Sequence, residues 1–259
     1  MEELKRVSNP LINFYFLRFL NDERIDFQKL SPLEAFVKVG NLKMVEFIMN
    51  SPINISVVPY NYFWNGVNNA AENSQIEMLK ILKSFHPNLF GMRDYICSHI
   101  FHATKNGQFE VFKFFIEGIS KNDLAILACQ YNIVNVAAEH GQLEIVKYFC
   151  QELPESFMTD YKGKSTIHFA ALNGHLEIVK YLCQKMPTPI VLDKTGNTPI
   201  HYAALSGHFE IVKFLTNFTF NPNIPNNKGI KPSDLAKLNG YANIEKYLAL
   251  STQWKKFKN

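Results

Sequence analysis

Residues 198–215 read TPIHYAALSGHFEIVKFL, and residues 165–182 read STIHFAALNGHLEIVKYL. The two stretches share most positions when one is shifted by 33 residues. Self-similarity at a fixed period of this size is typical of a stacked repeat architecture. A stack of repeats presents a long surface and usually no buried reaction chamber, so the repeat bears on function as well as on fold.

The period extends over most of the chain. Its marker is the glycine that precedes the second apolar stretch of each unit, replaced once by serine. The markers, spaced by 33 or 34 residues, are Gly40, Ser74, Gly107, Gly141, Gly174, Gly207 and Gly240. Small or apolar residues precede each marker, and apolar residues follow it at helical spacing. The pattern predicts about seven units.

Each unit is predicted to form one turn and two short helices. Gly196 permits a turn with positive φ, and Thr198-Pro199 then starts a helix with proline near its first position. The alanine pair Ala203-Ala204 lets neighbouring first helices approach closely. Gly207 ends the first helix, so that residues 209–215 return antiparallel. No unit buries its apolar face alone, and its neighbours must complete the core.

These units resemble ankyrin repeats, whose pattern is Asp-x-x-Gly-x-Thr-Pro-Leu-His-x-Ala-Ala-x-x-Gly-His-x-x-Ile-Val-x-x-Leu-Leu. The match is specific around Gly174 and Gly207, and clear around Gly240. It is looser in the first four units, where the histidine position holds Glu34, Asn68, Phe101 and Asn135. The resemblance covers roughly residues 11–250. It implies a mainly α solenoid of helix-turn-helix units joined by β-turn or hairpin tips.

Unit boundaries follow from the markers. Residues 1–30 are predicted to be an N-terminal capping half-repeat, residues 31–250 the ankyrin repeat domain, and residues 251–259 a short basic tail. First helices are predicted to start near 31, 65, 98, 132, 165, 198 and 231. The apolar run at residues 11–20 is too short to cross a bilayer and carries Arg18. No secretory signal is expected at the start of the chain.

Charge and cysteine usage limit the possible partners. The net charge is +4 without a concentrated basic face, so no nucleic-acid binding is expected. In the second helices, lysines follow glutamates by three positions, which predicts a solvated ladder of ion pairs. The four cysteines lack metal-type spacing, and Cys150 and Cys183 lie one period apart, too far for a disulfide. Reduced thiols indicate an intracellular protein, cytoplasmic or nuclear.

No catalytic constellation is found. His168 and His201 recur with the period, whereas a catalytic histidine is needed once. The resemblance implies that each hydrogen-bonds the neighbouring turn and the threonine position of its own unit. Cys97 and His99 lack a third group to orient the base. No glycine-rich phosphate loop is present. The protein is therefore predicted not to be an enzyme and to need no cofactor or metal.

The resemblance implies that partners bind a concave groove lined by the tips and the first helices. The tips and helix ends give the candidate binding residues Tyr161, Lys162, Lys164, Leu172, Asn173, Lys194, Thr195, Asn197, Leu205, Ser206, Asn227 and Lys228, with Ile230, Leu238 and Asn239 at equivalent positions. The tips are polar and rich in lysine, which indicates an acidic or polar partner face. The alternative is that they are only solvated turns.

An aromatic segment stands apart. Counted back from Ser74, the tip of the second unit falls on residues 60–64, which include Tyr60, Tyr62 and Trp64. Aromatic residues are enriched at binding hot spots, so these three are candidate binding residues. The alternative is that the segment packs inward as local core.

The function predicted from these patterns is a monomeric scaffold or adaptor that binds another protein, without nucleic acid or membrane. A pre-ordered surface lowers the entropic cost of docking. Two alternatives are an inhibitor or substrate-adaptor subunit of another enzyme, and an enzyme with a hidden site in the divergent residues 51–135.

Overall fold

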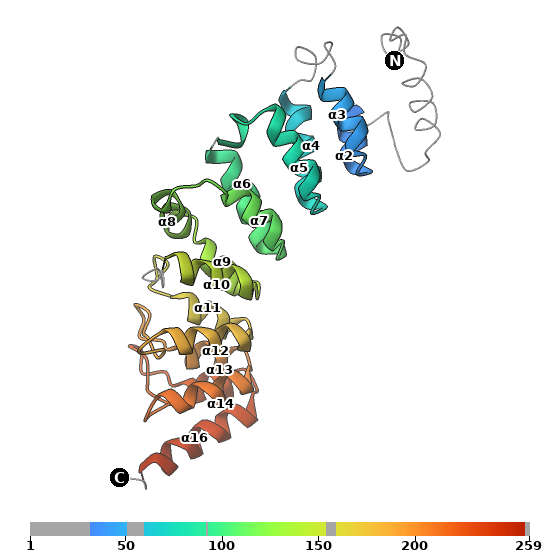
Figure 1. Cartoon of the computed structure of the whole chain (residues 1–259). Coiled ribbons are helices and arrows are strands. Elements are labelled where there is room, and N and C mark those ends of the chain that lie inside the picture. The colour runs from blue at the N-terminus through green and yellow to red at the C-terminus, as the bar shows by residue number, and fades with distance from the viewer. Residues whose placement is uncertain (1–31, 51–59, 92, 154–158, 257–259) are drawn as a thin grey trace. The chain divides into compact units, whose positions relative to one another are not determined.

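The computed structural model describes residues 32–50, 60–91, 93–153 and 159–256, and the predicted N-terminal half-repeat at residues 1–30 lies outside them (Figure 1). The chain forms two compact parts, one ending at Met92 and the other beginning at Arg93. The described residues are mainly helical and contain no strand, only an isolated bridge between Thr159 and Ser165. The predicted mainly α repeat architecture is confirmed.

The first part contains two helix pairs. Its elements are α2 (Pro32–Lys38), α3 (Leu42–Asn50), α4 (Tyr60–Glu72), α5 (Ile76–Phe85) and a short 3-10 helix, η2 (Leu89–Gly91). Helix α2 packs on α4, and α3 packs on α5. First helices therefore contact first helices, and second helices contact second helices, as a repeat stack requires.

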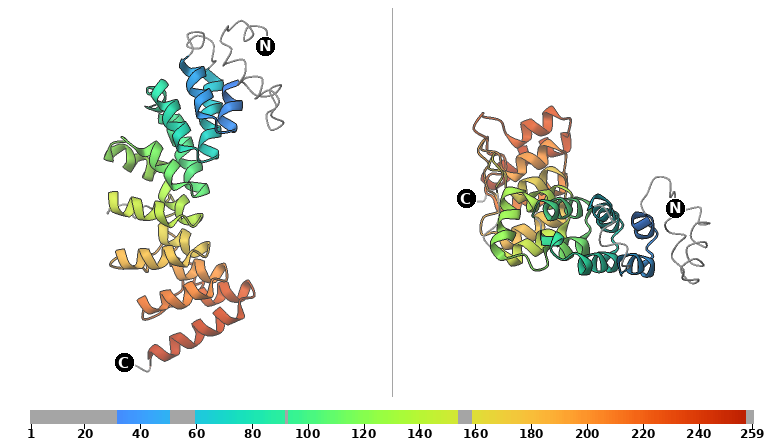
Figure 2. Two further views of the ribbon diagram at one scale, coloured as in Figure 1. Left: turned by 45° about the vertical axis from the view of Figure 1, so that its right-hand side comes forward. Right: turned by 90° about the horizontal axis from the view of Figure 1, so that it is seen from above.

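The second part continues the pairing from α6 to α16. Its elements are α6 (Arg93–Asn106), α7 (Phe109–Ile116), α8 (Lys121–Gln130), α9 (Ile133–Glu139), α10 (Leu143–Glu152), α11 (Thr166–Leu172), α12 (Leu176–Lys185), α13 (Pro199–Leu205), α14 (Phe209–Leu215), η3 (Thr216–Phe218), α15 (Pro232–Leu238) and α16 (Ala242–Lys256). The first helices α6, α9, α11, α13 and α15 pack in chain order, and so do the second helices α10, α12, α14 and α16 (Figure 2).

Alanines form the contact between first helices. Ala137-Ala138, Ala170-Ala171 and Ala203-Ala204 are buried in α9, α11 and α13. Their small side chains let adjacent helices approach closely. Larger apolar residues of the second helices, such as Ile178 and Leu182, fill the layer behind them.

Three predicted boundaries are wrong. Helices α4 and α6 begin at Tyr60 and Arg93, about five residues before the predicted starts near 65 and 98. The predicted tail from residue 251 is helical as far as Lys256, since it forms the last part of α16. The regular helix α13 begins at Pro199, and a residue that precedes proline is disfavoured in helix. A proline, Pro59, also directly precedes α4, so α4 starts immediately after it, about five residues before the predicted start; no proline directly precedes α6.

Helix α8 was not predicted. It occupies residues between α7 and α9, where the period predicts a turn tip. Ser120 caps its first turn, because the Ser120 hydroxyl accepts a hydrogen bond from the Asp123 backbone N–H at 3.1 Å. The β-turn tips of the prediction are therefore found in the C-terminal units and not between α7 and α9.

Candidate protein-binding face

Three regular tips connect the C-terminal helix pairs. They are the turns at Asp160–Gly163, Asp193–Gly196 and Asn226–Gly229, and each is closed by the side chain of its first residue. Asp193 Oδ1, for example, accepts backbone N–H bonds from Thr195 at 2.8 Å and from Asn197 at 2.9 Å. Aspartate and asparagine favour turns because they bond to the backbone two residues further on.

Backbone hydrogen bonds join successive tips. The N–H of Lys194 donates to the carbonyl of Lys162 at 3.0 Å, and the N–H of Asn227 donates to the carbonyl of Thr195 at 3.0 Å. The Asn226 side-chain amide also donates to Asn197 Oδ1 at 2.8 Å. The three tips therefore form one hydrogen-bonded row, which fixes their positions relative to one another.

His168 and His201 tie each first helix to the next tip. The Thr198 N–H donates to His201 Nδ1 at 3.0 Å, so the ring proton lies on Nε2, which donates to the Ile230 carbonyl at 3.2 Å. His168 repeats this arrangement between the Ser165 N–H and the Asn197 carbonyl. Burial lowers the pKa of both imidazoles, which keeps them neutral at physiological pH. The structural role inferred for these histidines is confirmed.

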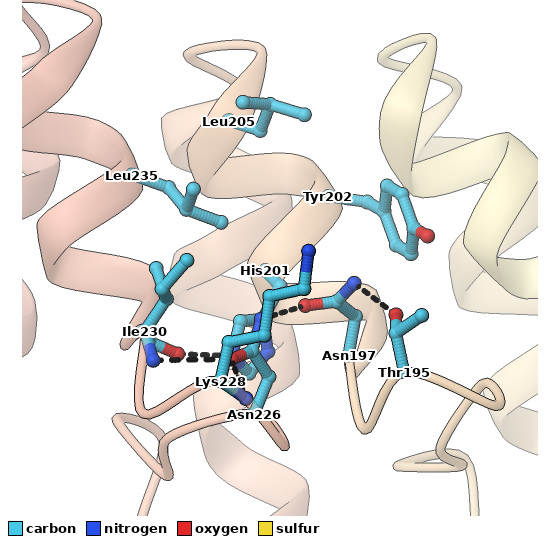
Figure 3. A pocket seen from close by; sticks show the side chains of 9 residues that line it. All are labelled: Thr195, Asn197, His201, Tyr202, Leu205, Asn226, Lys228, Ile230 and Leu235. Carbon is cyan, nitrogen blue, oxygen red and sulfur yellow. Dashed lines mark hydrogen bonds between the residues drawn. The ribbon is translucent and has the colours of Figure 1, made fainter.

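A pocket of about 190 Å³ opens between the tips of 193–196 and 226–229 (Figure 3). Its upper walls are apolar and come from Tyr202, Leu205 and Leu235 of helices α13 and α15, with Ile230 on the adjoining tip. Its other lining residues are Thr195, Asn197, His201, Asn226 and Lys228. Figure 3 shows the Lys228 side chain extending upward beside Asn197, toward the apolar walls.

A buried hydrogen bond joins one pocket wall to its tip. The Tyr202 hydroxyl donates to Asp193 Oδ2 at 2.6 Å. Burial opposes ionisation of Asp193, but the bonds from Tyr202, Asn197 and Thr195 outweigh it and lower its pKa to about 2. Burial and the same bond raise the pKa of Tyr202. Asp193 is therefore an ionised carboxylate directed into the protein, and it is buried.

A family model for ankyrin repeats (3 copies) matches residues 100–190 and 186–256. These two matches cover more than half of the chain. The chain belongs to the ankyrin repeat family. Comparison with curated proteins gives no match. Ankyrin repeats are generally protein–protein interaction modules, and the family is typically non-enzymatic.

The pocket of these ankyrin repeats gathers five of the predicted binding residues, Thr195, Asn197, Leu205, Lys228 and Ile230. The sequence prediction missed Tyr202, Asn226 and Leu235 as lining residues. The available signal was the large apolar side chain five positions before the marker, which recurs as Phe169, Tyr202 and Leu235. This signal does not by itself indicate a binding residue, because a large apolar side chain at this position can also pack in the core.

The other predicted residues differ in how freely they face solvent. Tyr161 is 77% exposed, and Lys162 is also exposed. Lys194 donates from Nζ to the Tyr161 carbonyl at 2.8 Å, and the Asn227 side chain donates to the Lys194 carbonyl at 3.2 Å. Lys194 and Asn227 therefore help to hold the tips together.

At the ends of the first helices, the ankyrin face is apolar. Leu172 and Leu205 are half-buried, and Leu238, at the equivalent position, is 82% exposed. Asn173 is exposed and its side chain donates to the Phe169 carbonyl at 3.0 Å, while Ser206 is half-buried. This face thus presents a row of leucines beside the tips.

The lysines of the tips differ electrostatically from those of the second helices. Four lysines of the second helices pair with a glutamate one turn before them, at 2.7 to 3.7 Å, namely Lys80, Lys113, Lys147 and Lys180. No carboxylate among the described residues pairs with Lys162, Lys164, Lys194 or Lys228. Within the described part of the chain, these four tip lysines therefore have no ion-pair partner.

The aromatic segment of the second unit is not a tip. Residues 60–64 form the first turn of helix α4. Trp64 is only 6% exposed and packs with Phe63 and Phe90, with ring centroids 6.0 Å from each. The structure favours the packing alternative for Trp64, because the longer α4 turns this side chain into the core. The side chains of Tyr60 and Tyr62 lie outside the described residues.

Burial distinguishes several of the side chains that could carry thiol chemistry. Cys97 and His99 are both buried in α6, and the His99 ring stacks on Phe115 at 4.6 Å. The cysteines form no disulfide, and burial raises the pKa of Cys150 to about 11 and of Cys183 to about 12. These two thiols are therefore protonated at neutral pH and are poor nucleophiles.

No group of three or more histidine, cysteine, aspartate or glutamate side chains converges among the described residues in a way that could hold a metal ion. No helix in the described part of the chain is long and apolar enough to cross a membrane.

Proposed function

We propose that this ankyrin repeat protein is a non-catalytic binding module, and that it docks another protein on the tip face. The tip face is the surface made by the tips at 160–164, 193–197 and 226–230 with the exposed sides of α11, α13 and α15. The observation that carries the proposal is the row of half-buried Leu172 and Leu205 and exposed Leu238 beside lysines that pair with no described carboxylate.

Rigidity supports the proposal. The tips are joined by backbone bonds between Lys194 and Lys162 and between Asn227 and Thr195, and both histidine ties are buried. A surface that is ordered before the partner arrives loses little conformational entropy on docking. Exposed apolar side chains such as Leu238 then contribute by leaving water when the partner binds.

The lysines provide a test of the proposal. Charge reversal of Lys162 or Lys228 to glutamate should weaken partner binding about tenfold, because it replaces attraction with repulsion at the rim of the interface. Both residues are exposed, and their side chains donate no hydrogen bond within the described protein, so the melting temperature should not change. Lys194→Glu should lower the melting temperature, because it removes the bond to the Tyr161 carbonyl.

The binding experiment uses the full chain as bait in cell lysate, with bound proteins quantified by mass spectrometry. The face variant is Leu238→Arg, which alters a residue that is 82% exposed, so its melting temperature should match that of the wild type. The matched control is Lys213→Glu, an exposed lysine of helix α14. Partners should be retained by the control and lost by the face variant. If every captured protein still binds Leu238→Arg, the proposed face is wrong.

A further inference from the structure

The pocket between the second and third regular tips has the size of one large side chain. Its volume is about 190 Å³. Pockets that enclose a whole small-molecule ligand usually measure roughly 300–1,000 Å³. At protein interfaces, buried anchor side chains fill small pockets near the centre of the contact. The dimensions therefore suit a single anchor residue of a docked segment.

The polar groups at the base of the pocket are already paired. Asn226 Nδ2 donates to Asn197 Oδ1 at 2.8 Å, and Asn197 Nδ2 donates to Thr195 Oγ1 at 2.8 Å. His201 Nε2 donates to the Ile230 carbonyl. An apolar side chain can cover these groups without leaving a donor or acceptor unsatisfied, which would otherwise cost about 1–3 kcal/mol each. The remaining contact surface is the apolar wall of Tyr202, Leu205, Ile230 and Leu235.

The rim of the pocket is positively charged. The Lys228 side chain is exposed and extends toward the apolar walls (Figure 3). The Lys164 ammonium lies 4.6 Å from the centroid of the Tyr202 ring. Two carboxylates belong to the tips, Asp160 and Asp193, and neither forms an ion pair with these lysines in the described residues. Asp193 is buried and bound by the Tyr202 hydroxyl, and Asp160 Oδ1 accepts the backbone N–H of Lys164 at 2.8 Å. A ligand that reaches the pocket meets two cations around an apolar cavity.

We infer that the pocket receives one large apolar side chain from a partner segment in which acidic residues flank that side chain. The flanking carboxylates pair with Lys228 and Lys164, and the apolar residue packs against Tyr202 and Leu235. Leu238, three residues further along α15 and 82% exposed, supplies a second apolar contact. This inference rests on the proposed function and adds the chemistry of the partner.

Charge complementarity separates this occupant from others. A basic segment is repelled by the lysines of three tips, and a neutral apolar segment leaves their charges without a partner. Electrostatic pairing at a rim chiefly raises the association rate and makes binding sensitive to salt. An acidic segment with an apolar anchor uses both features of the pocket.

The test uses random twelve-residue peptides displayed on phage and selected on the full-length chain. Selected peptides are then synthesised, and their affinities for the wild type and for Lys228→Glu, Lys213→Glu and Leu238→Arg are measured by fluorescence anisotropy. The inference expects peptides with one large apolar residue among aspartates or glutamates. Lys228→Glu should bind them about tenfold more weakly, whereas Lys213→Glu, with the same change in net charge, should stay within about twofold.

Changes in the peptide complete the test without altering the protein's fold. Replacement of the apolar residue by alanine should weaken binding at least tenfold. Replacement of the acids by lysine should abolish binding to the wild type and restore it to Lys228→Glu.

Two outcomes contradict the inference in different ways. In the first, the selected peptides bind Leu238→Arg more weakly and yet carry no acidic residues, or they bind Lys228→Glu as well as the wild type. Either result overturns the inference and leaves the proposed binding face intact. Peptides indifferent to both variants, or no selected peptide at all, contradict the inference and the proposed face together.

Discussion

At the residue scale, single side chains connect a tip to its helix and to the next unit. His201 bonds the start of α13 through Thr198 and bonds the following tip through the Ile230 carbonyl. Tyr202, its neighbour, bonds Asp193 with its hydroxyl and forms part of the pocket wall with its ring. One turn of α13 therefore supports the fold and shapes the candidate site.

Tyr202→Phe should destabilise the protein in a pH-dependent way. It removes a hydrogen bond to the Asp193 carboxylate and should cost about 1.5–3 kcal/mol at pH 7. The folded pKa of Asp193 is about 2, below the unfolded value of about 3.9. The stability from this shift is present above about pH 4 and is lost as the pH falls toward 2.

In the variant, the pKa of Asp193 should be lowered less than in the wild type, because the Tyr202 bond is missing. The variant should therefore lose less stability on acidification, and its difference from the wild type in free energy of unfolding should narrow below pH 4. Urea unfolding at a series of pH values between 7 and 2.5 measures this gap. A gap that stays constant with pH would show that Tyr202 acts only through packing.

Gly174→Ala should be destabilising for two reasons that can be separated. Gly174 has φ +84°, and a Cβ there would lie 2.7 Å from His208 Cε1. His208 donates from Nε2 to the Leu172 carbonyl at 3.0 Å, so moving its ring also costs that bond. The expected loss is about 2–3 kcal/mol, of which about 1–2 comes from the left-handed backbone.

Gly229→Ala is the matched control, because Gly229 has φ +78° and open space around an added Cβ. It should lose only the backbone contribution. Addition of His208→Ala to Gly174→Ala should remove the steric part, which a double-mutant cycle by urea unfolding detects. Equal losses at both glycines would contradict the steric argument.

At the scale of elements, the start of each first helix depends on its N-terminal signal. Helices α13 and α15 begin at prolines, Pro199 and Pro232, and each has seven residues. Helix α4 starts directly after Pro59 and has 13 residues, and α6, which no proline directly precedes, has 14. The inserted helix α8 has its own N-cap at Ser120. Where the sequence of a unit departs from the ankyrin pattern, the length and number of its helices therefore change, but the helix pairs remain.

Ser120→Ala should loosen α8 locally. The hydroxyl of Ser120 accepts from the Asp123 N–H at 3.1 Å and donates to Asp123 Oδ2 at 2.7 Å. Loss of such a cap costs about 1 kcal/mol, so amide hydrogen exchange in the first turn of α8 should speed up about fivefold. Exchange in α13 should not change, and Ser120→Thr should keep the cap. Uniform acceleration in both helices would contradict a local role.

At the scale of the whole molecule, stability in a repeat array is a sum of contributions from units and from contacts between neighbours. The C-terminal units have joined tips and buried histidine ties, whereas the position equivalent to His201 in the second unit holds Asn68, which is exposed. The two compact parts therefore differ in how closely their residues match the ankyrin repeat pattern.

The first part should unfold at a lower urea concentration than the second. Trp254→Phe leaves Trp64 as the single tryptophan, and because Trp64 is 6% exposed, its fluorescence reports unfolding of the first part. The Trp64 transition should precede the main loss of far-UV ellipticity, to which the larger second part contributes most. Coincident transitions would mean that both parts unfold as one cooperative unit.

The amino-acid sequence by itself determined the repeat, the helix pairs and the positions of the regular tips. These depend on signals within a few residues, such as Gly196 for a positive φ, Thr198-Pro199 for a helix start and the apolar period of residues 209–215. Local backbone conformation follows from such signals, so the C-terminal units were predictable almost residue by residue.

Only the tertiary structure decided the pocket, the lack of ion pairs at the tip lysines among the described residues and the burial of Trp64. The pocket joins Thr195 to Leu235, and its bonds link residues 29 to 33 positions apart in sequence, such as Asn197 with Asn226. These arrangements depend on how neighbouring units stack and which side chains find space or partners between them. A local pattern does not specify such contacts, because they form between segments that meet only in the folded stack.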